Sequence, residues 1–375
     1  MSVFALAIAA FVSLHPKSAT ISVTDSNIVH SPYNWHSEPA YTETPNPGAY
    51  LKLGFTGTSI AANLDLSPLT DAKVSPEQYP LIRYSIDNGP GTVVQLSPKS
   101  KLLQCATGLK SDDHTLFLQY VSGYVFLDFW TPVNVLKITE FLVDDGAMSV
   151  PTKSQTKNAL FLGDSITNGD DDTATFAGGI TNAVDTQDAT IGYPSVVAAA
   201  TGSEYGAVAY GGASWDGTAA DGHTPGLMTF WSMIDKDHSR LVKNKISEKL
   251  QDSFTPIPDD IYVNMGENRT PKVDDVVKLI GKLRMASSFD TNIFIIVPFS
   301  GRARTQLNAG VKLFRESAGR PELKVFLLDL GNNLYLPGNR PTLFSVDGQH
   351  PLAALHALLG AQIVAERARL LALKR

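Results

Sequence analysis

The sequence contains a single cysteine, Cys105, among 375 residues. An intramolecular disulfide, a multi-cysteine zinc site and an iron–sulfur cluster each require at least two thiols, so one cysteine excludes all three. We therefore expect Cys105 to be a free thiol buried in a hydrophobic core.

Charged residues are scarce as well. They make up 18% of the chain, below the roughly 25% of an average globular protein. The 31 basic and 37 acidic residues give a net charge of −6, and the basic residues form no cluster. This pattern excludes a disordered, highly charged chain and argues against nucleic-acid binding through the phosphates. Hydrophobic residues reach 43%, and the length predicts about two domains, each with its own core.

Long hydrophobic runs are also missing. The apolar run from Val3 to Leu14 is far shorter than the roughly 20 residues that a membrane-spanning helix needs, so no membrane span is predicted. We interpret residues 1–19 as a signal-type segment. Together with the low charge, this segment predicts an extracellular or periplasmic protein.

Alternating apolar residues characterise residues 20–149. The alternation is clear in residues 51–55, 82–86, 116–120 and 136–138, and turn-forming residues such as those at 87–91 separate such segments. A period of two is typical of strands with one buried face, and no long helical period appears in this range. We predict an all-β sandwich domain of the jelly-roll type.

A different pattern begins after the polar residues 150–157, which we interpret as a linker. Short apolar runs at residues 159–162, 262–265, 293–297 and 325–328 alternate with longer amphipathic segments, and a last helix is expected at 351–371. Continuous apolar runs are typical of parallel strands covered by helices on both faces. Residues 158–375 are therefore predicted to form a three-layer α/β/α domain.

The first of these runs leads directly into Gly163-Asp164-Ser165. Ligands of parallel sheets bind at the carboxyl ends of the strands, so Ser165 is placed where a nucleophile belongs. The alternative is that Ser165 only caps the next helix, a common role for serine.

A carboxylate and a histidine lie three residues apart near the end of the chain, at Asp347 and His350. Imidazole can take the proton of a serine hydroxyl because its ordinary pKa lies near neutrality, and a carboxylate can orient the ring. The spacing alone is a weak signal. Combined with Ser165, it predicts a Ser-His-Asp triad.

Acyl transfer also needs hydrogen-bond donors for the oxyanion. The glycine pair Gly211-Gly212 and the amide of Asn268 each follow an expected strand and can supply them. The alternatives are a tight turn at the glycines and a helix cap at Asn268.

In this order, the four segments resemble the blocks of the SGNH or GDSL hydrolases, over about 220 residues. The resemblance implies a flavodoxin-like fold, with Ser165 as nucleophile, His350 as base and Asp347 as the third triad member. It also implies that Ser165 N–H, Gly212 and Asn268 bind the oxyanion, and that no metal or cofactor takes part. Arg269 departs from the family, which usually has Asp at that position.

The preceding sandwich makes the chain similar to carbohydrate esterase family two, whose members deacetylate plant polysaccharides and sometimes use only a Ser–His pair. The expected function is removal of acetyl groups from a carbohydrate such as acetylxylan, with Trp215 stacking on a sugar ring. Core packing of Trp215 is an equal alternative. A short-chain or lipid esterase and a non-catalytic carbohydrate-binding protein are the other candidates. The sequence lacks the G-x-S-x-G, G-x-x-x-x-G-K-[ST], G-x-G-x-x-G and H-E-x-x-H motifs of other enzyme classes.

Overall fold

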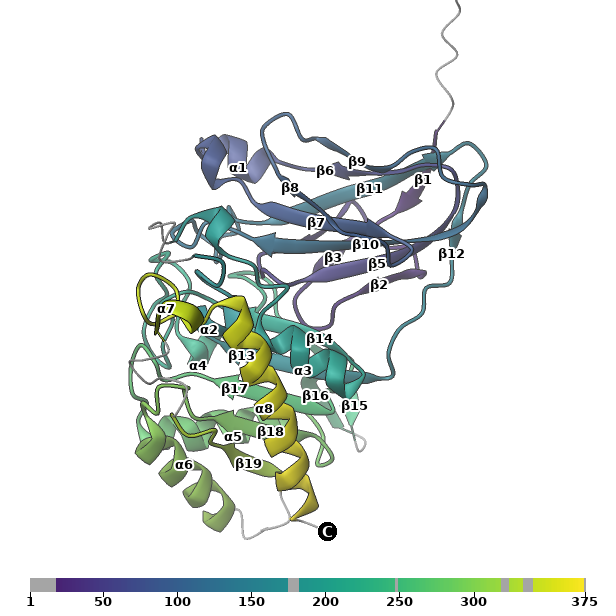
Figure 1. Cartoon of the computed structure of the whole chain (residues 1–375). Coiled ribbons are helices and arrows are strands. Elements are labelled where there is room, and N and C mark those ends of the chain that lie inside the picture. Colours follow the sequence, from purple (N-terminus) through teal and green to yellow (C-terminus); the bar gives the residue numbers. More distant parts are fainter. Residues whose placement is uncertain (1–17, 175–181, 247–248, 318–323, 333–339, 374–375) are drawn as a thin grey trace, which may run out of the picture.

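Two antiparallel sheets form the N-terminal part of the computed structural model, which describes residues 18–174, 182–246, 249–317, 324–332 and 340–373 (Figure 1). The predicted signal segment lies outside the described residues except for residues 18 and 19, which begin the first strand. The first sheet has the order β3-β4-β11-β6-β9, and β1 also pairs with β11. Its strands are β1 (Ser18–Ser22), β3 (His36–Glu38), β4 (Tyr41–Thr44), β6 (Ile60–Leu64), β9 (Leu102–Ala106) and β11 (Leu136–Asp144).

The second sheet has the order β12-β5-β10-β7-β8, and β2 also pairs with β5. Its strands are β2 (Ile28–His30), β5 (Tyr50–Gly57), β7 (Leu81–Ile86), β8 (Thr92–Gln95), β10 (Asp112–Ser122) and β12 (Ser149–Val150). The helices α1 (Ser67–Asp71) and η1 (Pro76–Gln78) lie between β6 and β7. The four segments in which the sequence alternates all form strands, as predicted.

One hydrophobic core lies between these two sheets, and we refer to the pair as the sandwich. Leu53 of β5 and Leu116 of β10 meet Ile60 of β6 and Phe141 of β11, and all four side chains are fully buried. Cys105 lies in the same core as a free thiol, as predicted, and burial raises its pKa to about 12. The period of two in the sequence therefore reflects one face of each sheet turned towards this core.

A five-stranded parallel sheet forms the centre of the C-terminal part, in the order β14-β13-β17-β18-β19. Its strands are β13 (Lys157–Gly163), β14 (Ser203–Ala209), β17 (Asp260–Asn264), β18 (Asn292–Ile296) and β19 (Val325–Leu328). The helices are α2 (Ser165–Asn168), η2 (Val184–Thr186), α3 (Tyr193–Thr201), α4 (Leu227–Phe230), α5 (Val273–Ala286), α6 (Arg304–Ser317), α7 (Arg340–Leu343) and α8 (Ala353–Ala372).

Helices cover both faces of this sheet (Figure 1). Phe161 and its neighbours on one face pack against α3 and α8, whereas Leu160 and its neighbours on the other face pack against α5 and α6. Both faces are apolar, which explains why these strands read as continuous hydrophobic runs. Among the helices that the structure describes, none combines the length and apolar character that a bilayer crossing requires.

Strand β14 is the strand expected before Gly211 and Gly212, and it combines the small residues Gly206, Ala207 and Ala209 with Tyr205 and Val208. A hairpin in the C-terminal part was not predicted. The hairpin of β15 (Leu241–Ile246) and β16 (Lys249–Phe254) lies outside the parallel sheet. The expected linker, residues 150–157, begins at the last residue of β12 and ends at the first residue of β13.

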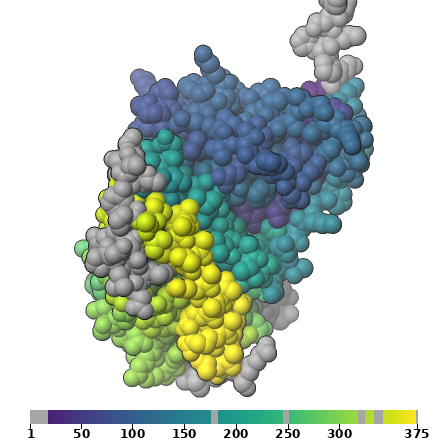
Figure 2. All heavy atoms as spheres, viewed as in Figure 1, coloured from purple at the N-terminus to yellow at the C-terminus, as the bar shows by residue number. Residues whose placement is uncertain are grey.

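The N-terminal and C-terminal parts pack directly against each other (Figure 2). Hydrogen bonds from the sandwich reach β14 of the parallel sheet. Strand β14 is at the edge of its sheet, yet all seven of its residues are buried. Glu204 accepts hydrogen bonds from Lys52 Nζ at 2.7 Å and from the Tyr50 hydroxyl, and Asn34 Nδ2 donates to the carbonyl of Ala207 at 3.4 Å. An exposed sheet edge is a template for aggregation, and here the sandwich covers it.

The contact is closest at Gly206, and this generates a test. A Cβ added there would overlap the carbonyl oxygen of Pro32 in the sandwich. Because two backbones would have to separate, we expect Gly206→Ala to lower the free energy of unfolding by about 1–3 kcal/mol, measured by urea denaturation. Gly281→Ala in α5 is the matched control, since its new Cβ would meet only Phe314, at 3.9 Å, and alanine favours helix. Equal stability of the two variants would contradict a close contact between the sandwich and β14.

Candidate active site

Ser165 lies at the carboxyl end of β13, where it is the first residue of α2 and only 6% exposed. The cap of this short helix is Asp164, whose Oδ1 accepts a hydrogen bond from the N–H of Ile166 at 3.3 Å. Gly169 ends the helix in the left-handed region, with φ of +74°. The capping role that could have explained Ser165 therefore belongs to its neighbour.

His350 and Asp347 are in direct contact, as their spacing predicts. The distance from His350 Nδ1 to Asp347 Oδ2 is 2.5 Å. The other carboxylate oxygen accepts the backbone N–H groups of Gln349 at 2.8 Å and of His350 at 3.0 Å. This loop fixes the carboxylate against Nδ1, so Nε2 is the ring nitrogen left for a serine.

The loop of His350 is attached to the segment that follows Ser165. The N–H of Ala353, at the start of α8, donates to the carbonyl of Asp172 at 3.0 Å. His350 Nε2 is buried and has no hydrogen-bond partner among the described residues, which include Ser165. The serine hydroxyl and the imidazole must therefore come closer for proton transfer, as catalytic contacts often do when substrate binds.

The charges around His350 favour its protonated form. Burial alone would lower its pKa, but the hydrogen bond and charge of Asp347, with the charges of Asp170 and Asp171, raise the pKa of His350 to about 9. Burial likewise opposes ionisation of Asp347, but its contact with His350 holds the pKa of that carboxyl well below its usual value. The site thus stabilises an imidazolium, the species formed when histidine accepts a proton from serine.

The predicted oxyanion donors follow β14 and β17, the two strands on either side of β13. Asn268 Nδ2 donates to the carbonyl of Ala213 at 2.9 Å, so the asparagine lies beside the loop that carries Gly212. Gly212 is exposed with φ of +72°, whereas Gly211 is buried against Val125 and Asp170. Of the two glycines, Gly212 is therefore the one open to solvent. Arg269, the departure from the family pattern, pairs with Asp216 at 3.1 Å.

The prediction for Trp215 is not supported. Its side chain is 1% exposed and lies in the hydrophobic core, with Nε1 donating to the carbonyl of Met265 at 3.2 Å. A ring without an exposed face cannot stack on a sugar, so core packing is the role that the structure gives this residue.

The structure buries Asp170, Asp171 and Asp172. Three consecutive acidic residues predict a solvated loop, with contact to sugar hydroxyls or a cation as the alternative, but all three are at most 2% exposed. Asp170 accepts from Asn168 Nδ2 at 2.6 Å, Asp171 from the N–H of Asn182 at 2.6 Å, and Asp172 from the N–H of Asp188 at 2.8 Å. Their position directly after the nucleophile segment is the one sequence signal that could have indicated a role in the site.

Among the residues that the structure describes, two clusters contain residue types that bind metal ions. They consist of Asp171, Asp347 and His350, and of Glu43, Asp235 and His238. In each, the histidine Nδ1 is hydrogen-bonded to a carboxylate, at 2.5 Å for His350 and 2.7 Å for His238. Two ligands of one zinc ion lie roughly 3 Å or more apart, because each bond is about 2.0–2.2 Å long. These contacts therefore fit hydrogen bonds better than metal ligation.

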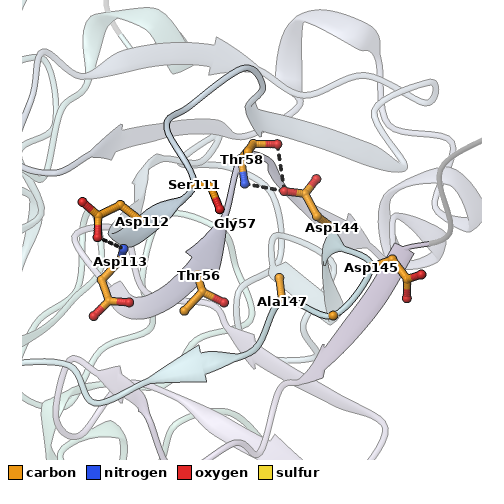
Figure 3. Close-up of a pocket in the computed structure, with 10 residues that line it drawn as sticks. Thr56, Gly57, Thr58, Ser111, Asp112, Asp113, Asp144, Asp145 and Ala147 are labelled. Atoms are coloured by element: carbon orange, nitrogen blue, oxygen red, sulfur yellow. Dashed lines mark hydrogen bonds between the residues drawn. The ribbon is translucent and has the colours of Figure 1, made fainter.

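A cavity of about 590 Å³ lies on the sandwich, away from all the predicted site residues (Figure 3). It is lined by Thr56, Gly57, Thr58, Ser111, Asp112, Asp113, Asp144, Asp145, Gly146 and Ala147. Asp144 uses its carboxylate within the protein, accepting from the Thr58 hydroxyl at 2.8 Å and the Ser59 N–H at 3.1 Å. The lining contains none of the residues predicted as nucleophile, base or oxyanion donor, so this cavity is not the candidate active site.

Solved structures share this fold over nearly the whole chain. A family two carbohydrate esterase from Cellvibrio japonicus aligns with a TM-score of 0.73 and 17% identity, covering 94% of this chain and 98% of that one. An acetyl xylan esterase from the rumen bacterium Butyrivibrio proteoclasticus aligns with a TM-score of 0.70 and 15% identity, covering 95% and 99%. A salicylyl-acyltransferase from a tetracycline biosynthetic pathway aligns with a TM-score of 0.61 and 15% identity, covering 94% and 98%.

No protein-family model matches the sequence, and no curated protein matches it. The structural matches confirm the resemblance to family two carbohydrate esterases at the level of the fold.

The His350–Asp347 pair should make stability depend on pH. The folded pKa of His350, about 9, is above its ordinary 6.5, so the stabilisation is complete below pH 6.5 and is lost as the pH rises through about 9. We expect the free energy of unfolding of the unmodified protein to fall, relative to His350→Gln, by on the order of 3 kcal/mol over that range. Urea denaturation at several pH values measures it.

His223→Gln is the control, because the side chain of His223 is 58% exposed. Its stability curve should run parallel to that of the unmodified protein. A difference between the unmodified protein and His350→Gln that stays constant from pH 6.5 to about 9 would show that the pair does not form.

Proposed function

We propose that the protein is a serine esterase that removes acetyl groups from a carbohydrate of the acetylxylan type. In this assignment residues 20–149 are a jelly-roll domain, 150–157 the linker and 158–375 an SGNH hydrolase domain. The observation that carries the proposal is the 2.5 Å contact between His350 Nδ1 and Asp347, beside the strand end that holds Ser165.

The proposed reaction begins when Ser165 Oγ attacks the acetyl carbonyl carbon while His350 Nε2 takes the hydroxyl proton. The carbonyl oxygen becomes an oxyanion, which the Ser165 and Gly212 N–H groups and Asn268 Nδ2 would stabilise. The C–O bond to the sugar then breaks, and His350 returns the proton to the departing sugar hydroxyl. Water releases acetate from the acyl-enzyme by the same steps, with His350 again as the base.

Two observations support a polymeric sugar rather than a small ester as the substrate class. The chain has the fold of carbohydrate esterases along nearly its whole length. The sandwich also reaches the site, because Val125, from the loop after β10, packs on Gly211 next to the proposed oxyanion donor. The burial of Trp215 removes the earlier support from that residue, so selectivity must come from other parts of the cleft.

Loss of the nucleophile is the direct test. We expect Ser165→Ala to lower acetate release from 4-nitrophenyl acetate and from acetylated xylan on the order of 10⁶-fold, as in serine proteases. Ser195→Ala is the control, because the Ser195 hydroxyl bonds only its own helix start, at the carbonyl of Gly192. Turnover of acetylxylan no better than that of longer-chain esters would favour a lipid esterase. An unmodified protein that is inactive on every ester but binds xylan would favour a binding protein.

The pH profile tests the base. A neutral imidazole is required, so kcat/KM should rise with pH until it levels off near the pKa of His350, about 9. Asp347→Asn removes the charge that favours the imidazolium, so the rise should move to lower pH while the maximal rate falls by about 10⁴-fold, as in a triad. An Asp347→Asn enzyme with the unmodified profile and rate would instead indicate a Ser–His pair.

A further inference from the structure

Asp171 lies beside the catalytic histidine, although it belongs to the segment that carries the nucleophile. Its Oδ2 is 3.9 Å from His350 Nδ1, and its side chain is 1% exposed. The same nitrogen is bound by Asp347 Oδ2 at 2.5 Å. The ring nitrogen that faces away from the serine is therefore close to two carboxylates from distant parts of the chain.

The backbone at Asp171 has a φ of +56°, in the left-handed region that aspartate adopts more readily than most residues other than glycine. Oδ1 accepts hydrogen bonds from the N–H of Asn182 at 2.6 Å and from the Thr186 hydroxyl at 3.1 Å. With Oδ1 held in this way, Oδ2 is directed towards His350.

The segment that holds Asp171 is itself anchored on the sandwich. Arg83 of β7 forms an ion pair with Asp188 at 2.6 Å, and the N–H of Asp188 donates to Asp172 at 2.8 Å. The Ser122 hydroxyl at the end of β10 donates to the carbonyl of Val184 at 2.7 Å. Asp171 is thus positioned by a rigid frame to which both parts of the protein contribute.

We propose that Asp171 is a second carboxylate partner of His350, a positioning residue that stabilises the imidazolium together with Asp347. For its effect on turnover, this inference rests on the proposed esterase function. Asp171 takes no proton in this scheme. The proton of Ser165 passes to His350 Nε2 and then to the departing alcohol, while the two carboxylates stabilise the positive charge that the ring carries in between.

Several other titratable groups lie near His350. Asp164 and Asp170 lie on the nucleophile segment, and His356 lies on α8. Asp170 differs from Asp171, because it accepts from Asn168 at 2.6 Å and packs on Gly211. His356 is fully buried, accepts from the N–H of Tyr193 at 3.2 Å and stays neutral, because burial lowers its pKa to about 3. The carboxylates of Asp347 and Asp171 lie within 4 Å of His350 Nδ1, at 2.5 Å and 3.9 Å.

Asp171→Asn is the test, because asparagine tolerates the left-handed region and keeps an oxygen for the hydrogen bonds of Asn182 and Thr186. Asp185→Asn is the matched control, since it removes the same charge from the exposed side of the same segment. The titration of His350 is followed by NMR of histidine-labelled protein, with His350→Gln to assign its signal. The pH profile of kcat/KM on 4-nitrophenyl acetate is recorded on the same variants.

We expect Asp171→Asn to lower the titration midpoint of His350 by about half a pH unit or more, because a nearby negative charge has been removed. The rise of kcat/KM should move to lower pH by the same amount, and kcat should fall roughly tenfold with little change in KM. Asp185→Asn should leave the midpoint, the profile and kcat unchanged. Equal His350 midpoints in Asp171→Asn and Asp185→Asn would overturn the proposal.

The two readouts separate this inference from the proposed function. If the unmodified protein cleaves no ester but Asp171→Asn still moves the His350 midpoint, Asp171 is its partner and the esterase assignment is wrong. If Asp171→Asn does not fold, Thr186→Val replaces it, because loss of the Thr186 hydroxyl weakens the support of the carboxylate. We then expect a smaller fall of the His350 midpoint, and no fall would overturn the proposal.

Discussion

The covering of strand β14 by the sandwich is the constraint on which the rest of the structure depends. This edge strand has Gly206 and Ala207 at its centre, so a neighbouring backbone can approach it closely there. Hydrogen bonds also join the sandwich to this strand, since Glu204 accepts from Lys52 and Tyr50. Because the loop with Gly211 and Gly212 follows β14, the contact between the sandwich and β14 also holds the segment proposed to bind the oxyanion.

The second feature that organises the molecule is the concentration of acidic side chains around one histidine. Few residues of this chain are charged, yet Asp164, Asp170, Asp171 and Asp172 are all buried within one short segment. Buried carboxylates are costly unless hydrogen bonds or an opposite charge compensate. Here backbone N–H groups, Asn168 and His350 provide that compensation, so the arrangement stabilises a protonated imidazole more than a neutral one.

Sequence patterns predicted those parts of the fold whose signal is local. Bulky alternating residues identified β5, β7, β10 and β11, and continuous apolar runs identified the central strands, because each pattern reflects which faces are buried. Strand β14 was expected only from its place before the glycine pair, because Gly206, Ala207 and Ala209 interrupt its apolar run. The Asp347–His350 contact was predictable from a spacing of three within one loop. The burial of Trp215 and of Asp170 to Asp172 was not, since each depends on segments that are distant in the sequence.

The acidic segment also shapes how the proposed base would titrate. Burial raises the pKa of Asp164 to about 7 and that of Asp170 to about 6, so both ionise in the range just below the pKa of His350, about 9. Each proton lost adds a negative charge near the imidazole, which strengthens the hold on its proton. Both carboxyls are therefore ionised before His350 loses its proton, and their charges add to those that favour the imidazolium. Fixed charges around a single histidine thus set the pH range in which the site can act as a base.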